Sequence, residues 1–145
     1  MRLRQVETLN ESQVADLHAL YQREWWSTGR SFDDVQLVVN NSSLLIGFVD
    51  EDDRLVAFCR IITDFVFHAW VYDVIVIESM RGKGIGRQIM NAVADHPRLK
   101  RVSAVWLCCL SEMVPFYERW GFNSSDEELK WMVKVQREGW TGPSQ

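Results

Sequence analysis

The stretch "WVYDVIVIESMRGKGIG" (residues 70–86) contains the strongest structural signal in the chain. Its first part, residues 70–77, is apolar at both alternating sets of positions, which is typical of a strand in the middle of a sheet. From Gly84 onward, apolar residues recur at helical spacing. Three alternating glycines separate the two elements, at positions 82, 84 and 86. Glycines at such a junction let the backbone turn sharply and present bare N–H groups, which at the positive end of a helix form a phosphate cradle.

The spacing of this loop excludes two common nucleotide motifs. A Walker A loop needs Ser or Thr after its lysine, but Lys83 is followed by Gly84. The dinucleotide fingerprint G-x-G-x-x-G fails because Arg87 and Ile89 stand where its last glycine is required. The basic residues Arg81, Lys83 and Arg87 nevertheless favour an anion. Phosphate binding is therefore the preferred interpretation, and a tight turn that only needs positive φ is the alternative.

The rest of the pattern predicts one mixed α/β domain over residues 1–145, built on a single sheet in the order β-α-α-β-β-β-α-β-α-β. The predicted strands are 3–8, 42–50, 54–64, 68–77, 101–110 and 128–136, and the predicted helices are 10–29, 31–41, 84–96 and 111–121. Asn10 with Gln13 has the pattern of a capping box, and Ser31 is the predicted cap of the second helix. We expect a flexible tail from about residue 138.

Composition limits the class of protein. Hydrophobic residues make up 47% and charged residues 25% of 145 residues, with a net charge of -4, so nothing indicates a nucleic-acid binder. No segment has the length of a membrane span. Cys59, Cys108 and Cys109 match neither a disulfide framework nor a zinc site, which favours reduced, buried thiols in a cytoplasmic protein without a metal. The three isolated histidines are expected at the surface.

Two motifs resemble the GNAT superfamily of N-acetyltransferases. The first is R-x-x-G-x-G, formed by Arg81, Gly84 and Gly86, which is the pyrophosphate-binding signature of that family. The second is "VPFYERWGF" (residues 114–122), which is similar to the late helix of the family and close to that of the serotonin (arylalkylamine) N-acetyltransferases. The resemblance implies a single mixed, mostly antiparallel twisted sheet with splayed central strands and flanking helices.

The resemblance also implies acetyl-CoA as the acetyl-donor cosubstrate. Its pyrophosphate would lie against the loop residues Arg81, Gly82, Lys83, Gly84, Ile85, Gly86 and Arg87. Its pantetheine arm would run beside the strand before the loop, at Val74, Ile75 and Val76, where a backbone N–H near Val74 would stabilise the thioester oxygen.

Two residues are candidates for proton transfer. By resemblance, Tyr117 would protonate the departing thiolate; the alternative is a helix aromatic whose ring packs and whose hydroxyl reaches solvent. Asp73 is a candidate base on physical grounds, because a carboxylate within an apolar strand must be paired or have its pKa raised. Its alternative is a structural hydrogen-bond acceptor, and Glu112 and Glu24 are other candidate bases.

This chain departs from the family pattern at two places. Trp70 and Tyr72 stand where the serotonin-acetylating relatives have histidines, and Leu110 stands where many members have a cofactor-contacting asparagine. The first difference puts both the base and an arylalkylamine substrate of this chain in doubt. For the missing asparagine, we expect backbone or water to replace its contact.

The acceptor site of the family is usually formed by the first two helices and their loop. Here we expect it to include Glu24, Trp25, Trp26 and Tyr72, where aromatic faces and a carboxylate would suit a cationic amine. Alternatively, one of the adjacent tryptophans is core and the other a lid.

The sequence leaves two functions open. The preferred one is acetyl transfer to a primary amine of a small molecule or peptide, directly within a ternary complex. The other is an acyl-CoA-binding module without turnover, which acts as a sensor. A homodimer is a further expectation, because Trp131 and Trp140 are expected to be exposed near the C-terminus.

Overall fold

The computed structural model describes residues 2–124 and 128–140, and within them the chain forms a five-stranded sheet in the order β1–β2–β3–β4–β5. All neighbouring strands are antiparallel except β4 and β5, which are parallel. The strands are β1 (Arg4–Val6), β2 (Leu44–Val49), β3 (Leu55–Thr63), β4 (His68–Val76) and β5 (Ala104–Trp106). The helices are α1 (Glu11–Gln22), α2 (Phe32–Asn41), α3 (Ile85–Ala94) and α4 (Val114–Glu118). The predicted mixed, mostly antiparallel sheet is confirmed.

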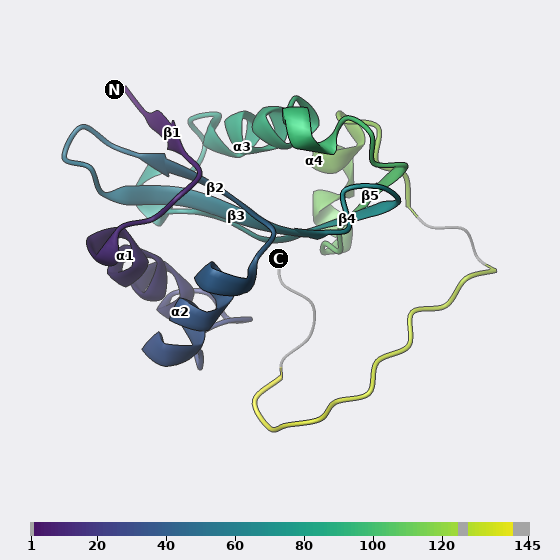
Figure 1. Ribbon diagram of the computed structural model, residues 1–145, viewed down its shortest axis with the longest axis horizontal. Coiled ribbons are helices and arrows are strands. Elements are labelled where there is room, and N and C mark those ends of the chain that lie inside the picture. The colour runs from purple at the N-terminus through teal and green to yellow at the C-terminus, as the bar shows by residue number, and fades with distance from the viewer. Residues whose placement is uncertain (1, 125–127, 141–145) are drawn as a thin grey trace.

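The helices cover both faces of the sheet, with α1 and α2 on one side and α3 and α4 on the other (Figure 1). Each side has its own apolar cluster. On the α3 side, Ile85, Ile89 and Val93 recur at helical spacing and are buried against the sheet. On the α1 side, Leu17 and Tyr21 are fully buried. These two layers pack against the central strands β3 and β4, on which the candidate site lies.

Helix-capping signals in the sequence have the expected effect. Asn10 and Gln13 form the reciprocal capping box, in which each side chain accepts a hydrogen bond from the backbone N–H of the other residue. The side chain of Ser31 caps α2 by accepting from the Asp34 N–H at 3.1 Å. Both predicted helix starts are therefore confirmed.

A β-bulge interrupts the pairing of β3 with β4. Phe58 lies opposite Ile75 and Arg60 lies opposite Tyr72, so Asp73 and Val74 together face a single residue of β3. Asp73 has a φ of 57°, in the left-handed region that aspartate tolerates better than most non-glycine residues. Because of the bulge, the consecutive side chains of Tyr72 and Asp73 both line one pocket on the α1 side instead of pointing to opposite faces.

The central strands splay apart, as expected for this class of sheet. Pairing between β4 and β5 ends at Trp70 and Trp106, whereas β4 continues to Val76. The edge of β4 that faces β5 is therefore not paired with that strand over residues 71–76. This edge leads directly from the bulge toward the glycine loop.

The predicted first helix extends too far. It ends at Gln22 instead of near Gly29, because two side-chain hydroxyl groups bind its final carbonyl groups. Ser27 Oγ donates to Tyr21 O at 2.8 Å, and Thr28 Oγ1 donates to Gln22 O at 2.9 Å. The chain thus turns back on itself after α1, and Trp25 and Trp26 lie in a loop.

The predicted last strand at 128–136 is wrong. These residues form no strand in the described structure and all of their side chains are exposed. Alternation of apolar residues gives a strand only where a neighbouring strand pairs with it, and the described sheet ends at β5. The segment is held instead by Trp131, whose ring lies edge-on against Trp70 at 5.0 Å, and by an ion pair between Arg137 and Asp34 in α2.

The expectation that all three histidines lie at the surface is wrong for His96, whose exposed fraction is 4%. It caps the short turn Pro97–Leu99, where its Nδ1 accepts from the Arg98 N–H at 3.2 Å. Its Nε2 lies 2.6 Å from Glu7 Oε1, so both ring nitrogens are used in structural contacts.

Among the described helices, none is long and apolar enough to cross a membrane.

Candidate active site

The glycine loop between β4 and α3 has the backbone conformation that its sequence indicates. Gly82 and Gly84 have φ values of 78° and 79°, and Gly84 caps the N-terminus of α3. A Cβ atom at either position would meet nothing within 4 Å, so the outer face of the loop is open. Gly86 has a different role: a Cβ there would lie 3.4 Å from the ring of Phe116, so glycine allows α3 to approach α4 closely.

Backbone donors gather at this loop. In the described part of the chain, no protein acceptor is recorded for the N–H groups of residues 82–87, and the first helical bond is from Gln88 N to Gly84 O at 3.2 Å. The side chains of Lys83 and Arg87 are exposed beside them. Open N–H groups, a helix N-terminus and two cations fit a pyrophosphate group.

Arg81 connects the loop to the end of α1. Its Nε donates to Val76 O at 3.1 Å, and its terminal nitrogen forms an ion pair of 2.5 Å with Glu24. Glu24 does not line the neighbouring pocket. Its carboxylate is bound to Arg81 instead. Glu24 thus does not lie with the other three residues predicted for the acceptor site.

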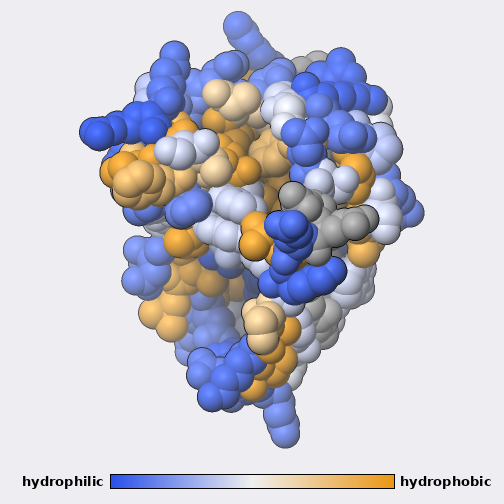
Figure 2. Space-filling model, turned by 90° about the vertical axis from the view of Figure 1, so that its right-hand side faces the viewer, coloured by the Kyte–Doolittle hydropathy of each residue, from blue (hydrophilic) through white to orange (hydrophobic). Residues whose placement is uncertain are grey.

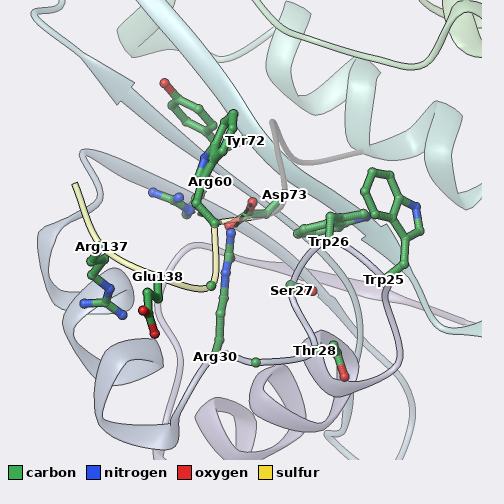
Figure 3. A pocket seen from close by; sticks show the side chains of 13 residues that line it. Trp25, Trp26, Ser27, Thr28, Arg30, Arg60, Tyr72, Asp73, Arg137 and Glu138 are labelled. Atoms are coloured by element: carbon green, nitrogen blue, oxygen red, sulfur yellow. Dashed lines mark hydrogen bonds and ion pairs between the residues drawn. The ribbon is translucent and has the colours of Figure 1, made fainter. Parts of the chain in front are cut away.

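A pocket of about 430 Å³ opens on the α1 side of the bulge. Its volume lies within the range of small-molecule sites. It brings together three of the predicted acceptor-site residues, Trp25, Trp26 and Tyr72, with the candidate base Asp73 (Figure 3). Trp26 is buried and packs into the core, whereas Trp25 is 56% exposed. This arrangement fits the alternative in which one tryptophan is core and the other a lid.

Asp73 is the centre of a charged cluster at the base of this pocket. Its carboxylate is fully buried, and among the described residues three side chains donate hydrogen bonds to it. The donors are Tyr21 Oη at 2.8 Å, Arg30 Nη1 at 2.8 Å and Arg60 Nε at 2.6 Å. A second, longer bond of 3.4 Å joins Arg30 Nη2 to the other carboxylate oxygen.

The pKa of Asp73 follows from these contacts. Burial alone would raise it, but the charges of Arg60 and Arg30 and their hydrogen bonds outweigh burial and hold the pKa below its usual value. For Tyr21, burial and then the charge of Asp73 raise the pKa well above that of free tyrosine, so its hydroxyl stays a donor. A carboxylate with a low pKa is a weak base, and these contacts favour the structural-acceptor alternative for Asp73.

Tyr117 lies on the other side of the sheet, in α4, with an exposed fraction of 3%. Its ring packs edge-on against Phe116 with 5.0 Å between centroids. Burial, followed by the charges of Cys109 and Cys59, raises the pKa of its hydroxyl. The phenol is therefore protonated near neutral pH, as a proton donor must be. Its burial does not favour the alternative in which the hydroxyl reaches solvent.

Sequence reasoning missed Arg30, Arg60 and Arg137, which all line the pocket. A signal for Arg60 was present, because it interrupts the apolar strand 55–62 in the same way that Asp73 interrupts the next strand. Two opposite charges in adjacent buried strands are expected to pair. Of the other candidate bases, Glu112 is exposed in the short turn Ser111–Met113.

Comparisons with known proteins find relatives of this chain in sequence and in structure. A family model described as the Acetyltransferase (GNAT) family matches residues 7–122. An uncharacterized N-acetyltransferase, ycf52, of Porphyra purpurea is 27% identical over 111 residues, which are 74% of this chain and 64% of that protein. Serotonin N-acetyltransferase 2, chloroplastic, of Oryza sativa subsp. japonica is 38% identical over 80 residues, or 55% of this chain and 40% of that protein.

A solved structure assigned to the GNAT family, from Xanthomonas campestris pv. campestris, has a TM-score of 0.80 with 26% identity, and the match covers 94% of both chains. The chain spans less than two thirds of the length of the two curated relatives, 64% and 40%. The structural match extends over nearly all of the fold.

Proposed function

Because the chain belongs to the Acetyltransferase (GNAT) family, we propose that it transfers an acetyl group from acetyl-CoA to a primary amine of a small molecule or peptide. Members of this family generally use acetyl-CoA. The observation that carries the proposal is that two features lie along the same strand. β4 has an open pocket at its bulge, and a loop rich in backbone N–H donors follows its end. One ligand lying along this edge would reach both.

The donor would bind in three parts. Its pyrophosphate fits the N–H groups of residues 82–87, with Lys83 and Arg87 beside it. Its pantetheine arm would lie beside Val74–Val76, where β5 has diverged from β4. The thioester would then reach the bulge next to the pocket, so that an amine held there could attack it.

In the reaction, the neutral amine nitrogen bonds to the thioester carbon and the carbon–sulfur bond breaks. The nitrogen loses one proton to solvent, the thiolate takes one proton from a donor of the protein, and solvent returns a proton to that donor. We assign the role of that donor to Tyr117, because its phenol is buried and stays protonated. The amine must lose a proton before it attacks. Asp73 is a poor acceptor for it, but the positive charges of Arg30 and Arg60 disfavour a bound ammonium ion, so the amine reacts in its neutral form.

The states of the thiols support direct transfer instead of an acyl-enzyme. Burial raises the pKa of Cys59, and burial also raises the pKa of Cys108 and Cys109. A thiol must ionise to act as a nucleophile. Initial rates measured against both substrates should therefore give intersecting lines in double-reciprocal plots, and parallel lines would point to a covalent intermediate.

The experiment for the proposed function measures product. The purified protein is incubated with acetyl-CoA and a panel of small amines and peptides, and acetylated products are identified by mass spectrometry. Amine-dependent product that requires the protein supports the enzyme. Binding of acetyl-CoA without product from any amine would instead support the sensor alternative.

Location and assembly remain predictions. A cytoplasmic location was expected, and the name of the rice relative gives a chloroplast as a second compartment to test. A fluorescent fusion would distinguish the two. A homodimer is proposed because Trp131 and Trp140 are 60% and 50% exposed, and apolar side chains reach the surface in several patches on one side of the molecule (Figure 2). Light scattering with size-exclusion chromatography would give the mass.

A further inference from the structure

The pocket at the bulge has more positive than negative charge at its base. Asp73 is the shared partner of two guanidinium groups, those of Arg30 and Arg60. Counting these three described residues, one carboxylate neutralises only one guanidinium, so the three together retain one positive charge. The Arg30 and Arg60 side chains are only 27% and 17% exposed, which means that water screens this charge less than at an open surface.

Arg60 retains donors that face no recorded protein acceptor. Its Nε binds Asp73, and among the described residues no hydrogen bond is recorded for its two terminal nitrogens. Its guanidinium lies 5.0 Å from the ring centroid of Tyr72, the residue opposite it in the sheet. Stacking on the ring and the bond to Asp73 hold the guanidinium in a fixed position at the pocket wall.

Over the whole lining, Glu138 offsets this surplus once Arg137 is counted with Asp34, but in the described structure none of the remaining charged groups binds the Arg60 guanidinium. Arg137 is paired with Asp34 at 2.9 Å, outside the pocket. Glu138 lines the pocket, but no ion pair joins it to Arg30 or Arg60 in the described structure. Glu24, the acidic residue expected to attract a cationic acceptor, is bound to Arg81.

Resting on the proposed function, we propose that the acceptor amine also carries an anionic group, a carboxylate or a phosphate, and that Arg60 binds this group. Both groups present oxygens that fit two terminal guanidinium nitrogens, and charge-assisted hydrogen bonds of this kind are stronger than neutral ones. Arg30 supports the site by sharing Asp73 and by stacking on Tyr21 at 4.5 Å. The apolar part of the acceptor would lie against Trp25 and Trp26.

The test uses matched pairs of amines that differ only in the anionic group. One pair is ethanolamine and O-phosphoethanolamine, and the other is 2-phenylethylamine and phenylalanine. Each is titrated by calorimetry into the protein saturated with CoA. We expect at least one anionic amine to bind roughly tenfold or more tightly than its neutral partner. The pair that shows the difference identifies whether the site binds a phosphate or a carboxylate group. Equal affinities in both pairs, or tighter binding of both neutral amines, would overturn the inference.

Variants then assign the effect to Arg60. Arg60→Lys keeps a positive charge beside Asp73 but removes the planar fork, so the preference for the anionic amine should fall roughly tenfold while the affinity for CoA is unchanged. Arg54→Lys is the matched control, because Arg54 lies beside the same strand with an exposed fraction of 67% and does not line the pocket. Circular dichroism checks that each variant is folded. If Arg60→Lys is unfolded, the comparison of amine pairs on the unmodified protein still tests whether the pocket prefers an anionic amine.

The same samples separate this inference from the proposed function. With acetyl-CoA in place of CoA, mass spectrometry detects whether the bound amine is acetylated. Tight binding of an anionic amine that is never acetylated would sustain the anion site and contradict the enzyme. Acetylation of neutral amines in preference to their anionic partners would sustain the enzyme and contradict the anion site.

Discussion

Arg60 Nε donates to Asp73 Oδ2 at 2.6 Å, although the residue opposite Arg60 in the sheet is Tyr72. The bulge explains this contact. Two residues of β4 face one residue of β3, and the positive φ of Asp73 turns its side chain to the same pocket as that of Tyr72. One irregularity of the backbone thus builds the base of the pocket.

Removing the charge of Asp73 should destabilise the fold. Asp73→Asn leaves Arg30 and Arg60 beside each other without a carboxylate, and loss of one partner from a buried ion pair costs about 3 kcal/mol. Urea denaturation would measure the change in the free energy of unfolding. Asp52→Asn is the control, because Asp52 is 80% exposed and should cost less than about 1 kcal/mol. Equal effects of the two substitutions would contradict a structural role for Asp73.

The contribution of Asp73 should have a distinct pH dependence. Its pKa in the folded protein is held below the unfolded value of about 3.9. Such a group stabilises the fold fully above its unfolded pKa and loses that stabilisation as the pH falls through its folded pKa. The stability difference between the unmodified protein and Asp73→Asn should therefore be constant from about pH 5 to pH 8 and shrink below about pH 4. A difference that shrinks between pH 6 and pH 7 would contradict the low pKa.

Replacing Tyr117 should slow turnover without weakening the binding of acetyl-CoA. Tyr117→Phe keeps the buried ring but removes the proposed proton donor, which for general acid catalysis corresponds to a loss of roughly 100-fold or more. Because the pKa of Tyr117 is raised, the loss should be the same at all pH values between about 6 and 9. Steady-state kinetics and calorimetry separate the two effects. Normal turnover would mean that another group protonates the thiolate.

Trp131 should hold the C-terminal segment against the sheet. Its side chain is 60% exposed, but its ring lies 5.0 Å from that of Trp70 and 6.1 Å from that of Trp106. Trp131→Ala should increase the rate of limited proteolysis within residues 128–140 and leave the rest of the domain intact. Met132→Ala, at a residue 93% exposed, should not change the rate. Equal rates for both variants and the unmodified protein would show that Trp131 does not hold the segment.

Local signals in the sequence predicted most of the fold. The capping box of Asn10 and Gln13, the cap at Ser31 and the glycine loop each depend on residues close together in the chain, and all three appear in the structure. The family and the splayed sheet followed from the loop and from the block at 114–122. The burial of His96 could not be predicted, because its partner Glu7 is distant in sequence.

The pocket was predicted only in part. Trp25, Trp26 and Tyr72 line it, and their part in binding an acceptor stays a prediction. Arg30 and Arg60 reach Asp73 through a bulge that alternation does not reveal. The strand predicted at 128–136 failed for a related reason. Its alternation describes the segment alone, whereas a strand also requires a neighbour in the sheet.

The most direct test of the central claim is a calorimetric titration of acetyl-CoA into the unmodified protein, Gly84→Glu and Gly121→Glu. Gly84 and Gly121 both have positive φ, 79° and 85°, and open space around a Cβ, so the two substitutions introduce similar strain and the same charge. Only Gly84 lies in the proposed pyrophosphate cradle. We predict micromolar binding to the unmodified protein and to Gly121→Glu, and none to Gly84→Glu. Unchanged binding to Gly84→Glu, or no binding to the unmodified protein, would contradict the assignment of the loop and with it the proposed acetyltransferase.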